Sequence, residues 1–451
     1  MSRESEKLFE AITRVSDEAV EAAKGGSLRP RRMRWIAPAA AMLALAILLT
    51  GLLSGRNLGS ACAVAEAQYP RGNVTQFYSD HGGELKEFLR RSVPQLLSGA
   101  KGENRVFSPL NLYIALSMLA EVTEGSSRAQ ILTLLGSEDM ESQRQKASEI
   151  WYRNYYTGEG GACTLASSLW LRQDMSYHQE TLDLLAKAYY ASSFRGKMGS
   201  EKYNRALQDW LNRQTGGLLR EQAGKVTLRP DTVLALVATL YFKGSWEGEF
   251  DKEKTLPQSF YAEAGELTRS FMHDVRSGTY YWGEGFSAAP LRFSNRRQML
   301  FILPEKGISP EDLLEDGEFM DFLTGDRSLW EQKEFVFLDL SIPRFDVVSD
   351  LNLLPELEAL GVTDALDPSL ADFSPLFDES AWVSQAKHAA RVAADEEGCV
   401  AAAFTVIGAS GGSAVQEPKR VEFTLDRPFL FAILGPDDLP LFIGIVNDPG
   451  L

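Results

Sequence analysis

The side chains with the strongest nucleophilic and metal-binding chemistry are few in this chain. The cysteines and histidines are Cys62, Cys163, Cys399, His81, His178, His273 and His388. Their spacing fits no H-E-x-x-H or zinc-binding pattern, so we expect no metal site. An odd and low number of cysteines also excludes a disulfide-dense scaffold. We read Cys399 as a small side chain rather than as a nucleophile.

Serine chemistry is represented by one weak pattern. Ser384-Gln-Ala-Lys387 fits the S-x-x-K motif of penicillin-recognising hydrolases. The companion motifs S-D-N and K-T-G do not occur in the sequence. The sequence therefore argues against an enzyme, and we expect no cofactor.

Residues 395–407 have a composition suited to a mechanical role. The segment begins with acidic residues and Gly398, continues with small residues and ends with β-branched ones, and no charge occurs between Cys399 and Gln416. Such a run is flexible as a loop, yet each of its side chains would fit into a β-sheet. A segment that can be both loop and strand is what a conformational switch requires. The alternative is a surface linker without function.

The elements that would position this segment follow from the hydrophobic pattern. Amphipathic helices are predicted early in the body, and buried or alternating strands later, which indicates an α+β domain around antiparallel sheets. Predicted helices cover residues 111–121, 180–190, 203–216 and 351–360; predicted strands cover 232–242, 298–303, 335–345, 429–434 and 441–446. The formal net charge of −16 argues against a nucleic-acid partner.

The N-terminal region predicts a membrane anchor. Residues 1–34 end in a cluster of basic residues, and residues 35–53 carry no charge, which is long enough for a helix to span a bilayer. The basic cluster keeps residues 1–34 cytoplasmic and places the body outside a cell membrane that the chain crosses once. Residues 54–74 are predicted as a linker before the body, 75–451. The alternative is a signal peptide cleaved within 61–65, which would release a secreted protein.

Several blocks of the body resemble the serpin family. These blocks stand in the order that the family has, and the resemblance covers essentially the whole body. Examples are Val106-Phe-Ser-Pro-Leu-Asn111, Leu240-Tyr-Phe-Lys-Gly-Ser-Trp-Glu247, Ile342-Pro-Arg-Phe345 and Phe423-Thr-Leu-Asp-Arg-Pro-Phe-Leu-Phe431. The chain looks like a membrane-anchored, bacterial-type member. The resemblance implies N-terminal helices packed on large, mostly antiparallel β-sheets with an exposed reactive loop at about residues 396–420.

The resemblance implies a suicide inhibitor of a serine protease. The protease attacks one bond of the reactive loop and forms an acyl-enzyme, and the cut loop then inserts as a strand into the main sheet. The implied partner is one target protease in a covalent 1:1 complex with a monomeric inhibitor. The alternative is a non-inhibitory serpin that acts as a surface binding or carrier module.

The resemblance assigns the loop hinge to Glu396, Glu397, Gly398, Cys399, Val400, Ala401, Ala402 and Ala403. On insertion, alternate residues would face the core, namely Cys399, Ala401, Ala403, Thr405 and Ile407. Val400 and Phe404 depart from the pattern of inhibitory members, although neither would bury a charge.

The scissile bond is predicted only as a window. Counting forward from Gly398 gives Gly412-Ser413, and counting backward from Phe423 gives Glu417-Pro418, so both counts cannot hold. The window comprises Gly412, Ser413, Ala414, Val415, Gln416 and Glu417. Its small aliphatic residues suit an elastase-like or subtilisin-like protease with a shallow pocket.

The remaining site residues implied by the resemblance are structural ones near the sheet opening: Ser108, Pro109, His388 and Trp246. The family usually has Asn at the position of Ala238, where it partners the histidine that matches His388. We therefore expect His388 to bond another group, such as Ser108 or a water.

Overall fold

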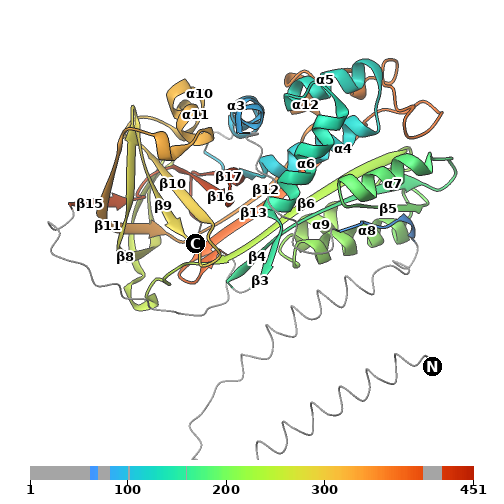
Figure 1. The fold of residues 1–451 in the computed structure, drawn as a ribbon. Helices are drawn as coiled ribbons and strands as arrows, with labels where there is room; N and C mark the ends of the chain where they lie inside the picture. The colour runs from blue at the N-terminus through green and yellow to red at the C-terminus, as the bar shows by residue number, and fades with distance from the viewer. Residues whose placement is uncertain (1–60, 70–81, 100–101, 159, 400–418, 451) are drawn as a thin grey trace, which may run out of the picture. The chain divides into compact units, whose positions relative to one another are not determined.

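The computed structural model describes residues 61–69, 82–99, 102–158, 160–399 and 419–450 (Figure 1). The chain divides into residues 1–53 and residues 54–451, and the described residues all lie in the second unit. The described helices are α3 (Gly82–Leu97), α4 (Pro109–Glu121), α5 (Gly125–Leu135), α6 (Met140–Asn154), α7 (Gln179–Ala188), α8 (Glu201–Gln214), α9 (Arg220–Lys225), α10 (Pro310–Glu315), α11 (Gly317–Thr324) and α12 (Leu354–Ala359), with 3₁₀ turns at Lys252–Lys254, Arg327–Leu329 and Asp364–Leu366.

Two large sheets form the body. The eight-stranded sheet contains β1 (Cys62–Ala65), β3 (Tyr156–Gly158), β4 (Gly161–Arg172), β5 (Ala191–Gly196), β6 (Leu234–Ser245), β12 (Phe345–Asn352), β13 (Lys387–Asp395) and β14 (Gly398–Cys399). The nine-stranded sheet contains β2 (Arg105–Phe107), β7 (Leu256–Ala262), β8 (Gly265–Gly283), β9 (Phe286–Arg292), β10 (Gln298–Pro304), β11 (Lys333–Pro343), β15 (Arg420–Thr424), β16 (Phe429–Leu434) and β17 (Pro440–Val446). Only the pairs β4–β5 and β11–β15 are parallel among the described strands. The predicted α+β class with mostly antiparallel sheets is confirmed.

The strand order of the eight-stranded sheet is β1-β5-β4-β6-β14-β13-β12. Helices cover both of its faces: α4, α5 and α6 lie over one face, and α8 and α9 lie over the other (Figure 1). Alternate residues of β4 accordingly join two different cores. Leu165 and Leu169 pack in the larger core with α4, whereas Ala166 and Trp170 pack in the smaller one with α8. This strand was not predicted, because burial on both faces removes the alternation of polar and apolar residues.

The later elements match their predictions closely. The predicted strand 429–434 coincides with β16, and 441–446 differs from β17 by one residue. Every residue of both strands is buried, so their unbroken apolar runs follow from double-sided burial. Pro343 ends β11 just before the chain crosses into β12 of the other sheet. The helix predicted over 351–360 is shorter, because residues 351–352 extend β12.

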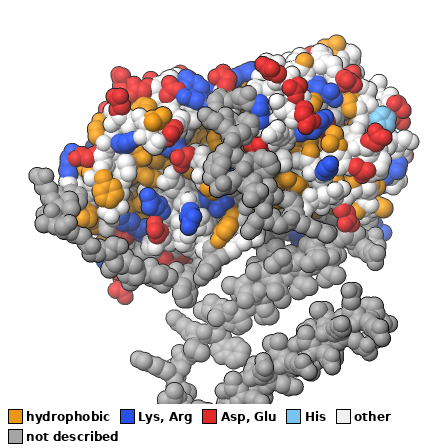
Figure 2. All heavy atoms as spheres, viewed as in Figure 1, with side chains coloured by type: hydrophobic (Ala, Val, Ile, Leu, Met, Phe, Trp, Pro, Cys, Tyr) orange, Lys and Arg blue, Asp and Glu red, His pale blue; other side chains and the backbone are white. Residues whose placement is uncertain are grey.

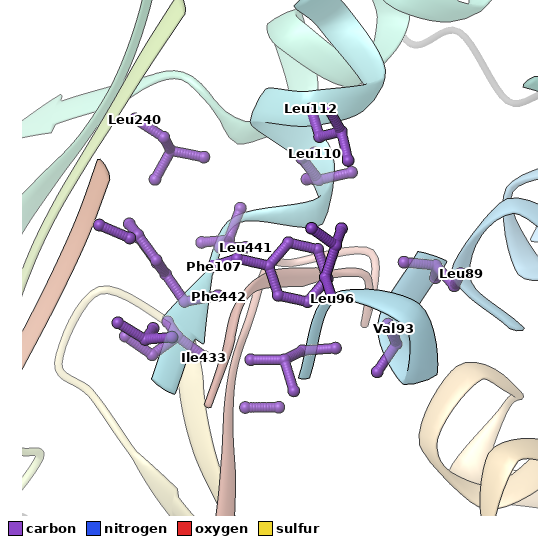
Figure 3. Close-up of a cluster of buried hydrophobic side chains, with 14 of the residues drawn as sticks. Leu89, Val93, Leu96, Phe107, Leu110, Leu112, Leu240, Ile433, Leu441 and Phe442 are labelled. Carbon is purple, nitrogen blue, oxygen red and sulfur yellow. The ribbon is translucent and has the colours of Figure 1, made fainter. Parts of the chain in front are cut away.

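Phe107 lies at the centre of the core between the sheets. Figure 3 shows side chains from α3, β2, α4, β6, β16 and β17 gathered around it, including Leu96 of α3 and Leu441 of β17. Only 1% of Phe107 is exposed. Strand β2 therefore packs the early helices against the last strands of the chain. It also pairs directly with the last strand, β17.

The N-terminal part of the described chain differs from the predicted linker over 54–74. Residues 62–65 form β1, which pairs antiparallel with β5 at the edge of the eight-stranded sheet. Tyr69 then stacks on Trp151, with ring centroids 5.7 Å apart. The predicted membrane segment 35–53 lies outside the described residues. Within the ranges that the structure describes, no helix is long and apolar enough to cross a membrane.

Phe107→Ala should lower the free energy of unfolding by about 3–5 kcal/mol, because it removes a fully buried ring and leaves a cavity. Phe335→Ala is the matched control, since Phe335 also lies on a strand but is 63% exposed. This control should change the free energy by less than about 0.5 kcal/mol. Denaturant unfolding of both variants measures the difference, and equal effects would contradict the assignment of the core.

Candidate hinge and sheet opening

The hinge begins where β13 ends. The carboxylate of Asp395 accepts hydrogen bonds from the backbone N–H groups of Glu397, at 2.9 Å, and Gly398, at 3.2 Å, and so fixes a tight turn. Gly398 has a φ of +149°. A Cβ atom at this position would lie 2.2 Å from the carbonyl oxygen of Gly244. The turn therefore requires glycine both for its backbone angle and for the close approach to β6.

After this turn the chain enters the sheet as β14. Gly398 pairs with Ser245 of β6 and with Asp395 of β13, and Cys399 pairs with Gly244 and Ala394. Cys399 is 2% exposed and joins the core on the α4 side of the sheet. Burial raises the pKa of the Cys399 thiol well above its usual range. A buried, protonated thiol is inert, in agreement with the prediction of a small side chain rather than a nucleophile.

The two acidic residues of the hinge are held by residues that follow β6. Glu396, 6% exposed, accepts a hydrogen bond from the hydroxyl of Thr255 at 2.7 Å. Its carbonyl accepts from the N–H of Phe250 at 2.8 Å. The carboxylate of Glu397 forms an ion pair with Lys252. These three partners were not predicted, and the only cue in the sequence was the basic pair in Asp251-Lys-Glu-Lys254.

Trp246 connects β6 to the hinge from the other side. Its indole N–H donates to the carbonyl of Asp395 at 2.8 Å, and its backbone N–H donates to the carbonyl of Glu397 at 3.1 Å. The indole stacks on Phe293, with centroids 4.6 Å apart and an angle of 9° between the planes. The predicted role of Trp246 near the sheet opening is consistent with these contacts, because its ring and its backbone both bond to the turn.

β6 and β13 lie on either side of β14 in the eight-stranded sheet. β6 and β13 are both paired to β14, and the described residues contain no ladder that joins β6 directly to β13. Strands that share one neighbour lie about 9.6 Å apart, which is two strand spacings. A cavity of about 90 Å³ lies at the lower end of this gap, between β6, the start of β13 and α4; its lining includes Leu234, Leu236, Ala238 and His388. We call this gap the slot.

His388 closes the slot towards α4. Its Nε2 atom accepts a hydrogen bond from the backbone N–H of Ser108 at 3.0 Å, so the expected bond to Ser108 is confirmed, through the backbone rather than the hydroxyl. The hydroxyl of Ser108 instead caps α4 by accepting from the N–H of Asn111, and Pro109 opens that helix. Asn111 in turn donates to the carbonyl of Ala238 at 3.0 Å. An asparagine side chain is thus present at the slot, supplied by α4 rather than by β6.

The remaining predicted residues cannot be placed. Val400, Ala401, Ala402 and Ala403 of the hinge and the window from Gly412 to Glu417 lie outside the described residues. Among the described residues, no group of three or more His, Cys, Asp or Glu could hold a metal ion. On the described part of the face in Figure 2, acidic and basic side chains are interspersed, without a continuous basic stripe.

The buried imidazole of His388 should make stability depend on pH. Burial lowers the pKa of His388 from 6.5 to about 4. Between these values the unfolded chain binds a proton that the folded chain does not, so lowering the pH should destabilise the fold by up to about 3 kcal/mol. His388→Gln keeps an acceptor for Ser108 but cannot titrate. Unfolding curves across this pH window should show a steeper loss for the unmodified protein; parallel losses would contradict the assignment.

The comparisons with known proteins agree with this geometry. A family described as Serpin (serine protease inhibitor) matches residues 84–449. Serpin B11 of Mus musculus is 26% identical, over 80% of this chain and 98% of the relative. Plasminogen activator inhibitor 1 of Neovison vison is 27% identical, over 87% of this chain and 98% of the relative.

Solved structures show the same fold. The native state of Tengpin, a thermophilic serpin, has a TM-score of 0.74 at 23% identity and covers 86% of this chain and 100% of its own. The complex of thyroxine-binding globulin with thyroxine has a TM-score of 0.68 at 21% identity and covers 82% of this chain and 100% of its own. With the family match over most of its length, the chain belongs to the serpin family of serine protease inhibitors, whose members are not catalytic enzymes.

Proposed function

We propose that this serpin inhibits a serine protease as a suicide substrate, by inserting its cleaved loop into the slot between β6 and β13. The observation that carries this proposal is the position of β14. Two residues of the loop are already paired on both sides, at the upper end of a gap in which no other described strand lies. Loop and acceptor therefore start in register, and insertion only has to extend an existing ladder.

The register of β14 defines what an inserted loop would meet. Residue 399 pairs with residue 244 of β6 and with residue 394 of β13. Because both pairings are antiparallel, each residue added along the loop would pair with the residue one number lower in each neighbouring strand. Ala403 would then lie between Leu240 and Ala390, and Thr405 would lie between Ala238 and His388. Leu240 and Ala390 are buried in the core that contains Cys399. The loop side chains that would face the core are thus small at the positions where the side chains of β6 and β13 are closely packed.

The opposite face of the inserted strand would be more tolerant. Ala402 would lie between Tyr241 and Arg391, both half-buried. Val400 and Phe404 belong to this same face, so the two departures from the family pattern would avoid the main core.

For the target we propose an elastase-like or subtilisin-like protease, held in a covalent 1:1 complex. The support for this choice is the small aliphatic window at residues 412–417.

The first test uses the full-length protein mixed with an elastase and, separately, with a subtilisin. Denaturing electrophoresis should show a band at the summed mass of inhibitor and protease, because the acyl-enzyme is covalent. Mass spectrometry of the released C-terminal peptide identifies the scissile bond. Ala403→Glu should abolish this band and leave loop cleavage, since insertion would bury a charge in the core at a cost of several kcal/mol.

Ala402→Glu is the matched control. It adds the same charge one residue away, where an inserted strand would place it beside Arg391, and it should keep the complex. Loss of the complex in both variants would indicate that the loop does not insert in this register. Cleavage without any complex in the unmodified protein would instead support the alternative, a non-inhibitory serpin that binds or carries another molecule.

We also propose that residues 35–53 anchor the serpin body outside a cell membrane. The support is the uncharged run behind a basic cluster in the sequence. The full chain should remain in the membrane fraction after alkaline carbonate extraction, and a variant lacking residues 35–53 should not. Recovery of a soluble product that begins within residues 61–65 would show cleavage of a signal peptide instead.

A further inference from the structure

The turn between β9 and β10 concentrates positive charge beside the hinge. Arg292 ends β9, and Arg296 and Arg297 precede β10. The backbone N–H of Phe293 donates to the carbonyl of Arg297 at 2.8 Å, which closes the turn. Ser294 of the same turn donates to the carbonyl of Ser245 at 2.9 Å. Three arginines are thus fixed next to the end of β6, where β14 pairs.

Among the described residues, the exposed guanidinium groups of this turn have no acidic partner. Many other arginines donate to carboxylates, as Arg144 does to Glu121 at 2.7 Å. By contrast, the exposed side chains of Arg292 and Arg296 make no hydrogen bond or ion pair with any described residue. In a chain with a net charge of −16, unpaired arginines so close together are not explained by the fold.

Arg297 is the buried member of this group of arginines. It is 3% exposed, and one of its terminal nitrogens donates to the carbonyl of Asn154 at 2.9 Å. Its guanidinium also lies 5.2 Å from the centre of the Tyr156 ring. Its Nε atom is buried without any hydrogen-bond partner among the described residues. A buried donor without a partner destabilises the fold unless something else accepts from it.

The three arginines line one cavity of about 310 Å³. At about 30 Å³ per water, it has room for roughly ten waters, or for an oxyanion with part of its carrier. Two acidic residues also line it, Glu247 and Asp438. Asp438 is engaged by Gln298, at 3.1 Å, and by Arg327, at 3.6 Å. Glu247 is exposed, so three cationic groups face one available carboxylate.

We propose that this cavity binds a phosphate or sulfate group. Arginine presents paired N–H donors that match tetrahedral oxyanions, and three such groups can surround one anion. Binding would neutralise the positive charge of the turn. The group could be a free ion or an ester on a larger molecule. The binding itself does not depend on protease inhibition.

The test measures binding to the full-length protein by isothermal titration with sodium phosphate, sodium sulfate and glycerol 3-phosphate, in a chloride buffer of matched ionic strength. We expect a dissociation constant of about 1 mM or tighter for at least one of them. Tighter binding of the ester than of the free ions would identify an ester as the source, and the reverse order would identify the free ion. Phosphate and sulfate that bind no better than chloride would overturn the proposal.

The variant Arg292→Gln/Arg296→Gln should weaken binding at least about tenfold, because it removes two charge-assisted contacts. Arg205→Gln/Arg220→Gln is the matched control, since it removes two exposed positive charges from α8 and α9. This control should leave the affinity unchanged. An equal loss in both variants would mean that the anion responds only to net charge, and the site would be rejected. Unfolding midpoints in chloride confirm that each variant is folded.

Discussion

A strand can enter the interior of a β-sheet only where two backbones two strand spacings apart present unpaired N–H and C=O groups. Most of this structure can be understood from that constraint. β6 and β13 are held at this separation by β14 at the upper end, and α4 supports the lower end through Ser108 and Asn111. The slot persists because both of its walls are fixed to other elements, and neither wall can move without disturbing buried contacts.

The contacts that hold the hinge differ in strength. The ion pair between Lys252 and Glu397 is partly exposed, and such pairs contribute about 1 kcal/mol or less. The bond from Thr255 to the carboxylate of Glu396 is largely buried, and losing one partner of such a bond costs more than the bond itself contributes. The hinge is therefore positioned mainly by Glu396, Trp246 and the backbone of the turn. These contacts pair β14 with β6 at the upper end of the slot.

Sequence patterns were sufficient for some elements and insufficient for others, for identifiable reasons. β16 could be predicted almost to the residue because burial on both faces produces an unbroken apolar run between turn residues. β4 was missed because burial on both faces removes its polar–apolar alternation, while Ser167 and Ser168 also interrupt an apolar run. β1 was missed because alanine has little strand preference of its own. The hinge glycine was predicted from the resemblance, but not its partners. Thr255 lies far from Glu396 in sequence, so only the fold brings the two together.

The short strand β1 has a consequence for association with other molecules. An open sheet edge with unpaired N–H and C=O groups can pair with strands from other chains. β1 occupies the edge beside β5 with only four residues, and its register shifts between Ala63 and Ala65. So short and irregular an edge is a poor template for further pairing. Loss of the residues around β1 would expose β5 as a longer and more regular edge, and aggregation through that edge would then be favoured.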